Sequence, residues 1–317
     1  MTDILRQYEA ARKQTVIADF SLRGKIEVRG SERIDFLHRI LTNDIKNLKP
    51  GSSCYAALLN AAGKTLAWMQ VFIFPDFVLL DTVPDFGGKL LELLDKYLIT
   101  EDVLLTDATG NYTHLVLYGA QAETKIATFQ NLTPTKDSLH KDKYHLLALQ
   151  DNKIEIIKSM NLLSVGPETL ECLRIENGEL IYGIDMDESI SFPETGLDDV
   201  AASETKGCYP GQEVVARTKT YKGLRKKMVG FILEKGKLPA AGDKIYPLLN
   251  PPPKIGGGEG GGEIGWITSA CYSPGLDKGI ALGYVAKGFF EEPKEVGIKI
   301  SSGLIAAKTT GLPFVQS

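Results

Sequence analysis

The sequence predicts an α+β fold that ends in an antiparallel β-barrel. Up to about residue 228, apolar patterns of helical and strand period interleave, as they do in sandwiches of the ferredoxin type. From Val229 onward, short apolar runs are separated by Gly and Pro at short intervals and carry no helical period, which is typical of a small barrel. We therefore expect two interleaved ferredoxin-like modules within 1–228 and a barrel within 229–317.

Periodicity places the elements of the first part in order. Apolar residues at helical spacing predict helices at 1–14, 31–41, 89–99 and about 120–131. Ser31 stands where the cap of the second helix is expected. Apolar runs predict strands at 24–30, 54–60, 66–83, 103–108 and 114–119. These elements alternate without a strict repeat, which favours α+β modules over a repeat architecture.

The expected barrel contains one stretch of unusual composition, PPPKIGGGEGGG at 251–262. Such a run cannot bury apolar surface, so we expect a mobile loop. Its glycines do not follow a strand and open a helix, which is the context that phosphate-binding glycine loops require. The composition therefore indicates a loop between strands and not a nucleotide site.

Composition excludes several classes of protein. With 317 residues, 43% hydrophobic and 24% charged, the chain can bury the cores of two or three domains. The net charge of −4 argues against a surface built as a whole to hold nucleic acid. The most apolar stretch, 68–83, is interrupted by Pro75, Asp76 and Asp81, and the N-terminus lacks the apolar core of a secretory signal. We expect a cytoplasmic protein that does not contact membranes.

The four cysteines are far apart in the sequence, at positions 54, 172, 208 and 271. No C-x-x-C pair and no cysteine–histidine pair at zinc spacing occurs, so we predict neither a disulfide framework nor a metal site. No G-x-S-x-G motif occurs either, and a serine hydrolase is not indicated.

Chemistry is concentrated in KGCYPGQEVVARTK, which begins at Lys206. Pro210 and Gly211 predict a turn, and a short helix is expected just after it. Cys208 then lies ahead of the helix N-terminus and two residues from Lys206, and both features lower the pKa of a thiol. The residues therefore allow either a reactive thiol on a loop or an inert cysteine buried in a tight turn.

Two further clusters carry charge. A basic run follows the turn, with members Arg217, Lys219, Lys222, Arg225, Lys226 and Lys227. It is either a solvated face or a cradle for an anionic tail. Upstream, carboxylates gather in 173–189, where the spacing fits no calcium loop. For Asp185 and Asp187, roles in turns and caps are as well supported as roles in acid–base chemistry.

Several stretches resemble a folate-binding family that includes the aminomethyltransferase of the glycine cleavage system. The resemblance covers nearly the whole chain. It rests on FLHRILTNDIKNL (36–48), LLNAAGKTL (58–66), LRIENGELIYGIDMDE (173–188), EIGWITSACYSPGLDKGIALGYV (263–285) and LPFV (312–315). Within that family, KGCYPGQEVVAR (206–217) is similar to the K-G-C-[YF]-x-G-Q-E signature of the YgfZ-like branch.

The resemblance implies a three-domain ring around a tetrahydrofolate site and a function in the assembly or repair of iron–sulfur clusters. Implied partners are iron–sulfur client enzymes, among them tRNA-modifying ones. Independently of the resemblance, the basic patch 217–227 leaves open an RNA-binding module with a weak tRNA contact. Cys208 is then the functional thiol, assisted by Lys206. The rest of the signature loop comprises Gly207, Tyr209, Gly211, Gln212, Glu213 and Arg217. Glu176 is the candidate for the pterin amino edge, where a carboxylate accepts two hydrogen bonds.

The sequence departs from the aminomethyltransferase pattern at one informative place. The aminomethyltransferase carries an Asp-Asp pair after the glycine turn of LLNAAGKTL, and this chain has Ala67 and Trp68. Neither side chain titrates, so neither can handle a proton. The main expectation is therefore an accessory factor, and the alternative is a one-carbon transferase of the aminomethyltransferase kind. We also expect Lys222, Arg225, Lys226 and Lys227 to contact the polyglutamate tail of cellular folates.

Overall fold

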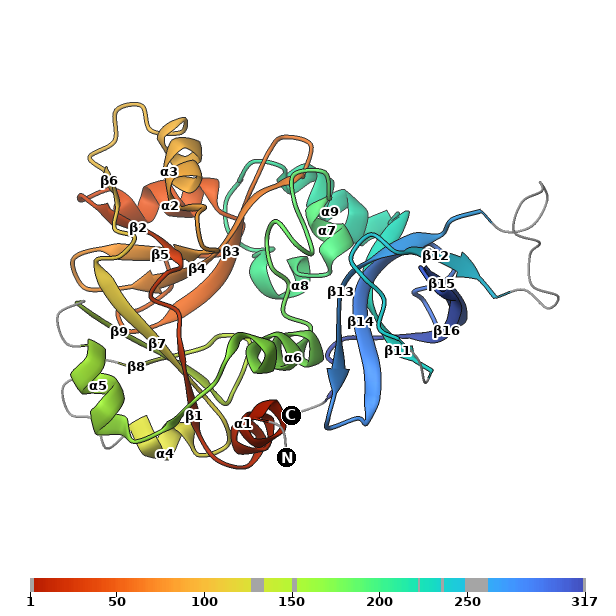
Figure 1. Cartoon of the computed structure of the whole chain (residues 1–317). Helices are drawn as coiled ribbons and strands as arrows, with labels where there is room; N and C mark the ends of the chain where they lie inside the picture. Colours follow the sequence, from red (N-terminus) through yellow and green to blue (C-terminus); the bar gives the residue numbers. More distant parts are fainter. Residues whose placement is uncertain are drawn as a thin grey trace. The chain divides into compact units, whose positions relative to one another are not determined.

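The computed structural model describes residues 3–126, 134–149, 153–221, 223–234, 237–248 and 262–315, and for 153–156 and 221 it describes the backbone only. Lys222 and, apart from Gly262, the expected loop 251–262 lie outside these residues. The chain divides into two compact units (Figure 1). The first unit comprises 1–169 with 197–216, and the second comprises 170–196 with 217–317. The domain boundary expected between 228 and 229 stays a prediction.

The first unit contains two five-stranded sheets. One sheet has the order β3 (Ser53–Leu59), β4 (Thr65–Ile73), β5 (Val78–Thr82), β2 (Gly24–Arg29) and β6 (Leu104–Asp107), all antiparallel. Helix α2 (Arg33–Ile40) connects β2 to β3, and α3 (Gly87–Asp95) connects β5 to β6. This is a ferredoxin-like module with one added strand.

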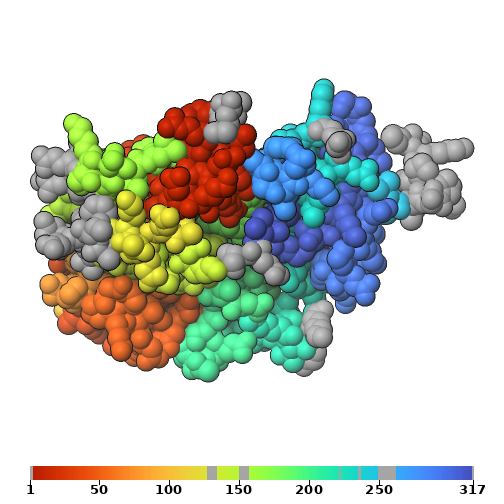
Figure 2. All heavy atoms as spheres, turned by 90° about the horizontal axis from the view of Figure 1, so that it is seen from below, coloured from red at the N-terminus to blue at the C-terminus, as the bar shows by residue number. Residues whose placement is uncertain are grey.

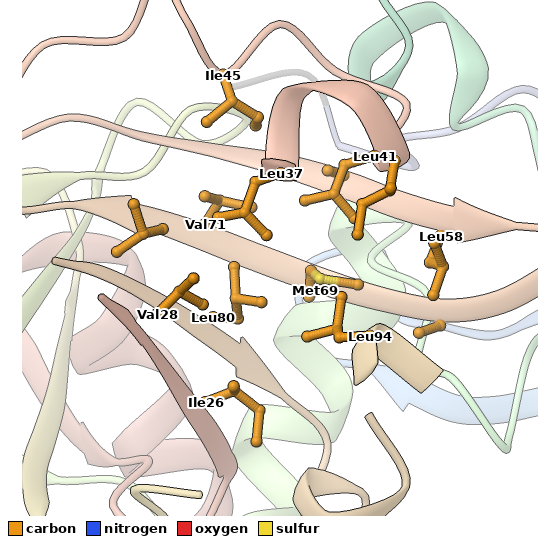
Figure 3. Packing of buried hydrophobic residues seen from close by; sticks show 14 of the residues in the cluster. Ile26, Val28, Leu37, Leu41, Ile45, Leu58, Met69, Val71, Leu80 and Leu94 are labelled. Atoms are coloured by element: carbon orange, nitrogen blue, oxygen red, sulfur yellow. The ribbon is translucent and has the colours of Figure 1, made fainter. Parts of the chain in front are cut away.

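Alternation along these strands explains where the core of this module lies. On β4, Met69 and Val71 point to the same side as Leu80 of β5, and α2 adds Leu37 to that side (Figure 3). These four side chains are at most 1% exposed. The apolar stripe of α2 and one face of the sheet therefore bury each other, which is the packing that the strand and helix periods predict.

The second sheet has the order β10 (Leu163–Ser164), β1 (Val16–Asp19), β7 (Tyr112–Tyr118), β9 (Lys143–Leu149) and β8 (Pro134–Lys136). Its helices are α1 (Asp3–Lys13), α4 (Ala122–Ile126) and α5 (Lys153–Met160). Helix α1 turns Tyr8 and Ala11 inward while its other residues contribute to the surface seen in Figure 2 (red). Strand β1 precedes the strands of the first sheet in the chain but pairs with β7 in the second sheet.

The second unit contains a closed six-stranded barrel. Its strands are β11 (Lys226–Leu233), β14 (Lys278–Ala286), β13 (Gly265–Ser273), β12 (Lys244–Pro247), β15 (Glu295–Ile300) and β16 (Gly303–Thr310). Every pairing around the barrel is antiparallel. Helix α6 (Pro167–Asn177) begins in the first unit and runs into the second, which also holds α7 (Phe192–Thr195). The predicted fold class is confirmed.

Two local expectations are wrong. The stretch 66–83 is not one strand, because Phe74 donates its backbone N–H to Phe77 in a turn that contains Pro75. Proline has no N–H to continue a ladder. Ser31 does not cap α2, because Glu32 precedes the helix and the Ser31 hydroxyl donates to Asp102 at 2.6 Å. Of the helix expected at 120–131, residues 122–126 are helical and 127–133 lie outside the described residues.

Candidate functional site: the Cys208 loop and buried Glu176

The loop that carries Cys208 is anchored to the first module through Thr42. The backbone N–H of Ser203 donates to the Thr42 carbonyl at 3.0 Å, and the Thr42 hydroxyl donates to the carbonyl of Ala201 at 2.6 Å. The same hydroxyl accepts the N–H of Ala57 on β3 at 2.9 Å. These bonds are buried, so the start of the loop is fixed to the edge strand of the first sheet.

Lys206 extends the anchor to the end of α2. Its side chain is buried, and Nζ donates to the carbonyl oxygens of His38, Leu41 and Asn43. The last carbonyls of a helix lack intrahelical partners, and a lysine ammonium supplies three donors. Burial lowers the pKa of Lys206 to about 8, against the opposing effect of Asp44. The lysine of the signature therefore closes the C-terminus of α2.

The turn after Tyr209 packs closely against another turn. Gly211 has φ of +80°, and a Cβ built on it lies 2.6 Å from the carbonyl oxygen of Asn60 and 3.0 Å from the Cα of Gly63. Gly63 has φ of +71°, and a Cβ built on it lies 2.9 Å from the Cβ of Val214. Two glycines are needed because any Cβ would separate the β3–β4 turn from the Cys208 loop.

Of the two alternatives for Cys208, a thiol on an accessible loop or a cysteine buried in a tight turn, the structure shows the accessible one. The Cys208 side chain is exposed, whereas the next residue, Tyr209, is buried with its ring 5.1 Å from the Lys206 ammonium. The thiol that contributes to the electrostatics of Lys206 belongs to Cys54, whose pKa is raised to about 12 by burial. Cys208 is therefore accessible on a well-anchored loop, and its activation by Lys206 stays a prediction.

Helix α9 (Gln212–Tyr221) follows the turn as expected and starts at Gln212, which is half-buried. Glu213 lies in its first turn, and Gly207, Glu213 and Arg217 are exposed. The helix N-terminus favours a carboxylate at this place.

The basic run is not uniform. Arg225 is exposed. Lys226 instead lies over the rings of Trp266 and Tyr284, at 4.7 and 5.7 Å, and 3.8 Å from a carboxylate oxygen of Glu194. Such a cation is partly neutralised by its neighbours. Within the described part of the run, Arg225 is thus more open to an anionic ligand than Lys226.

In the second unit, Glu176 near the end of α6 is a fully buried carboxylate. Its Oε1 accepts the hydroxyl of Ser273 on β13 and lies 3.8 Å from the Cys172 thiol. The Glu176 carbonyl accepts the N–H of Phe314, which fixes the end of the helix to the C-terminal segment. The sequence predicted a role for Glu176, which stays a prediction, but it gave no sign of Cys172 and Ser273 beside it, because sequence spacing alone does not relate these positions.

The neighbouring carboxylate Asp185 is structural. It is buried and accepts hydrogen bonds from Arg174 at 2.8 Å and from the hydroxyls of Thr268 and Ser269 at 2.7 Å each. Among the described residues, no group of three or more histidine, cysteine or acidic side chains is arranged to hold a metal ion.

The comparisons with known proteins fit this architecture. Residues 1–160 match the model of the GCVT N-terminal domain, and residues 226–316 match that of the glycine cleavage T-protein C-terminal barrel domain. This chain belongs to the glycine cleavage T-protein family. The two matches correspond to the ferredoxin-like modules and to the closed barrel.

Relatives within the family share about a quarter of the residues. The chain is 26% identical to an aminomethyltransferase of Thermosipho melanesiensis over 99% of its length and 90% of the relative's. It is 23% identical to that of Bacillus subtilis, over 99% and 91%. A crystal structure of aminomethyltransferase T from Bartonella henselae superimposes with a TM-score of 0.85 at 20% identity, covering 98% of this chain and 89% of that one. The fold is therefore that of the T-protein family.

Against this family background, the environment of positions 67 and 68 is informative. Ala67 is fully buried in the core between the first sheet and its helices. Trp68 is 7% exposed, and its ring stacks on Tyr55 at 5.4 Å between centroids and 13° between planes. Packing occupies both places, and no titratable side chain stands there.

Among the described residues, no helix is long and apolar enough to cross a membrane.

Proposed function

We propose that this chain is a tetrahydrofolate-binding accessory protein for the assembly or repair of iron–sulfur clusters in client enzymes, of the YgfZ-like branch. The observation that supports the proposal most is the exposed thiol of Cys208 on a loop held by Lys206 and Gly211. A thiol presented to solvent on a fixed loop can meet a partner protein with little loss of entropy. The signature KGCYPGQE therefore reads as a docking and thiol-presenting element.

The folate part of the proposal depends on Glu176. A buried carboxylate accepts pairs of N–H donors, which is what the amino edge of a pterin offers. Glu176 is fully buried and its carboxylate is oriented by Ser273, so it is a suitable acceptor for the N–H donors of a pterin. Tetrahydrofolate would supply a carrier for one-carbon units when bound. The role of this chain's residues is to hold and orient it.

Aminomethyl transfer is the second candidate, favoured by the names of the curated relatives. The packing of Ala67 and Trp68 counts against it, because no carboxylate stands there to handle a proton. Turnover of an aminomethyl-lipoyl carrier with tetrahydrofolate distinguishes the two functions. We expect folate binding by calorimetry without turnover, and turnover at a rate typical of enzymes would replace the first proposal with the second.

The thiol is tested by Cys208→Ala in cells that lack the wild-type chain. We expect the activity of cluster-dependent clients to fall to the level of the cells without the protein, while the unfolding midpoint stays that of wild type. The matched control is Cys54→Ala, which removes a buried thiol of the same unit. Wild-type client activity in Cys208→Ala removes the thiol from the function.

Activation of the thiol is tested separately, by the alkylation rate of Cys208 against pH in the wild type and in Lys206→Met. We expect wild-type Cys208 to react faster than free cysteine near neutrality and the variant to lose that advantage. If the rate of alkylation depends on pH in the same way in both proteins, Lys206 does not activate the thiol and serves only to hold the end of α2.

Two contacts with partners complete the proposal. Arg225, with Lys222, meets the glutamate tail of the folate, so a polyglutamylated folate should bind more tightly than a monoglutamylated one at low salt. A tRNA contact through 217–227 should weaken steeply between two salt concentrations in a gel-shift titration. We place these functions in the cytoplasm, where thiols stay reduced.

A further inference from the structure

Two of the four cysteines lie next to each other in the second unit, although 99 positions of sequence separate them. Cys172 is on α6 and Cys271 is on β13. The Cys172 sulfur lies 3.5 Å from the backbone oxygen of Tyr272, the residue after Cys271, and the neighbouring Cys271 thiol helps to raise the pKa of Cys172.

Regular geometry explains why the pair meets. Cys172 and Glu176 are four residues apart on one face of a helix, about 6 Å along its axis. Cys271 and Ser273 are two residues apart on one face of a strand, about 6.7 Å along it. Because Ser273 donates to Glu176, the same spacing brings Cys271 to Cys172 one step earlier. The two cysteines and the Glu176–Ser273 pair are therefore neighbouring contacts between the same helix and the same strand.

Access to the two sulfurs differs. Cys271 is half-buried, and Cys172 is 4% exposed. A small oxidant therefore meets Cys271 first. The Cys172 thiol lies 3.8 Å from the Glu176 carboxylate, which can accept its proton. A more accessible attacking thiol next to a buried partner is the arrangement of redox-sensitive dithiols.

We propose that Cys172 and Cys271 are a modification site at which hydrogen peroxide forms a disulfide between α6 and the barrel. The Cys271 sulfur attacks one peroxide oxygen, the O–O bond breaks, and the leaving hydroxide takes up the proton of the Cys271 thiol to become water. The Cys172 sulfur then attacks the resulting sulfenic acid at sulfur while its proton passes to Glu176. The leaving hydroxide takes this proton from Glu176 and becomes the second water, so two thiols lose two electrons and one peroxide becomes two waters.

The disulfide changes the surroundings of Glu176. Its carboxylate loses the Cys172 thiol as a neighbouring donor, and the turn of α6 that carries both residues is tied to β13. If Glu176 holds a pterin, as the proposed function has it, oxidation also alters folate affinity. Formation of the disulfide itself does not depend on that function.

The experiment uses the full chain with Cys208→Ser, so that the exposed thiol does not form disulfides between molecules. After a short treatment with dilute hydrogen peroxide, we expect intact mass to show a monomer that has lost two hydrogen atoms. After denaturation, Cys54 alone of the three remaining cysteines should react with maleimide, and dithiothreitol should restore the reactivity of the other two. Peptide mapping without reductant should find Cys172 joined to Cys271.

Single variants provide matched controls. In the same background, Cys271→Ser should keep the Cys172 thiol through the treatment, because the attacking sulfur is absent. The wild-type chain is mapped in parallel, so the conclusion does not depend on whether a variant folds. Three unmodified thiols after peroxide, or a linked peptide that contains Cys54, would overturn the proposal. Neither result bears on folate binding, which calorimetry on the reduced protein measures separately.

Discussion

Nε2 of His114 lies 2.9 Å from Nδ1 of His145 in the layer between the two sheets of the first unit. The outer nitrogens of the pair face carboxylates, with Asp81 3.2 Å from His114 and Asp137 2.9 Å from His145. All four side chains are buried. Three contacts in series need three protons, but two neutral imidazoles carry two. The hydrogen bonding and the charge of this buried layer therefore depend on whether the histidine pair takes up a third proton.

We predict that this layer makes the protein less stable below neutral pH. Burial lowers the pKa of His114 to about 3 and lowers that of His145 as well, against the attraction of Asp81 and Asp137. The unfolded chain therefore binds more protons than the folded one once the pH falls below about 6.5. The free energy of unfolding, from urea titrations, should fall by about 1 kcal/mol per pH unit between pH 6 and 4 on account of His114, and His145 should add to the fall in the same direction.

The matched pair of variants is His114→Gln and Phe72→Leu. Phe72 contacts both rings edge-on, so its truncation disturbs the same layer without removing a titrating group. Phe72→Leu should keep the wild-type slope of stability against pH, and His114→Gln should lower it. Parallel slopes in all three proteins would show that the histidine pair does not set the dependence.

Gly211→Ala should destabilise the first unit through the contact of two turns. The alanine needs a left-handed backbone and would place its Cβ 2.6 Å from the Asn60 oxygen. Gly51 is a matched control, because its φ is +87° and nothing lies within 4 Å of its Cβ. We expect about 1 kcal/mol for Gly51→Ala, from backbone strain alone, and at least about 1 kcal/mol more for Gly211→Ala. Equal unfolding midpoints in urea would contradict the close approach.

Lys206→Met should cost about 2–4 kcal/mol at pH 7, because it leaves buried carbonyl oxygens of His38, Leu41 and Asn43 without their ammonium donor. The control is Lys89→Met on the exposed face of α3, expected within about 0.5 kcal/mol of wild type. Chemical denaturation measures both. A loss no larger than that of Lys89→Met would mean that water replaces the lysine at these carbonyls.

Most of the architecture could be predicted from local patterns. Helical and strand periods follow from which face is buried, so the ferredoxin-like modules and the barrel were accessible without coordinates. Pro75 indicated that the stretch 66–83 is interrupted. Because the strands on both sides of the turn are buried, however, their apolar residues form one continuous run in which a hairpin is hard to recognise. Boundaries depend on turn chemistry more than on hydrophobicity.

The site could be predicted only in part. The turn around Gly211 could be predicted from the residues next to it. The carbonyl partners of Lys206 could not, because they lie more than 160 positions away in the sequence. The signal that could have found the histidine layer was one histidine in each of two apolar strands, at 114 and 145. Their pairing requires the register of the second sheet, which local patterns leave open.

Ala67→Asp tests whether this fold can accept a carboxylate at the position where the aminomethyltransferase pattern has one. Ala67 is fully buried among apolar side chains, so we expect a loss of several kcal/mol relative to Ala67→Asn, which matches its size without the charge. Burial raises the pKa of such a carboxyl group, so the difference should be largest at pH 7 and narrow as the pH falls towards 4. Urea titrations of both variants at several pH values measure it. If Ala67→Asp is as stable as Ala67→Asn at pH 7, packing does not exclude the carboxylate, and the case against aminomethyl transfer loses its structural basis.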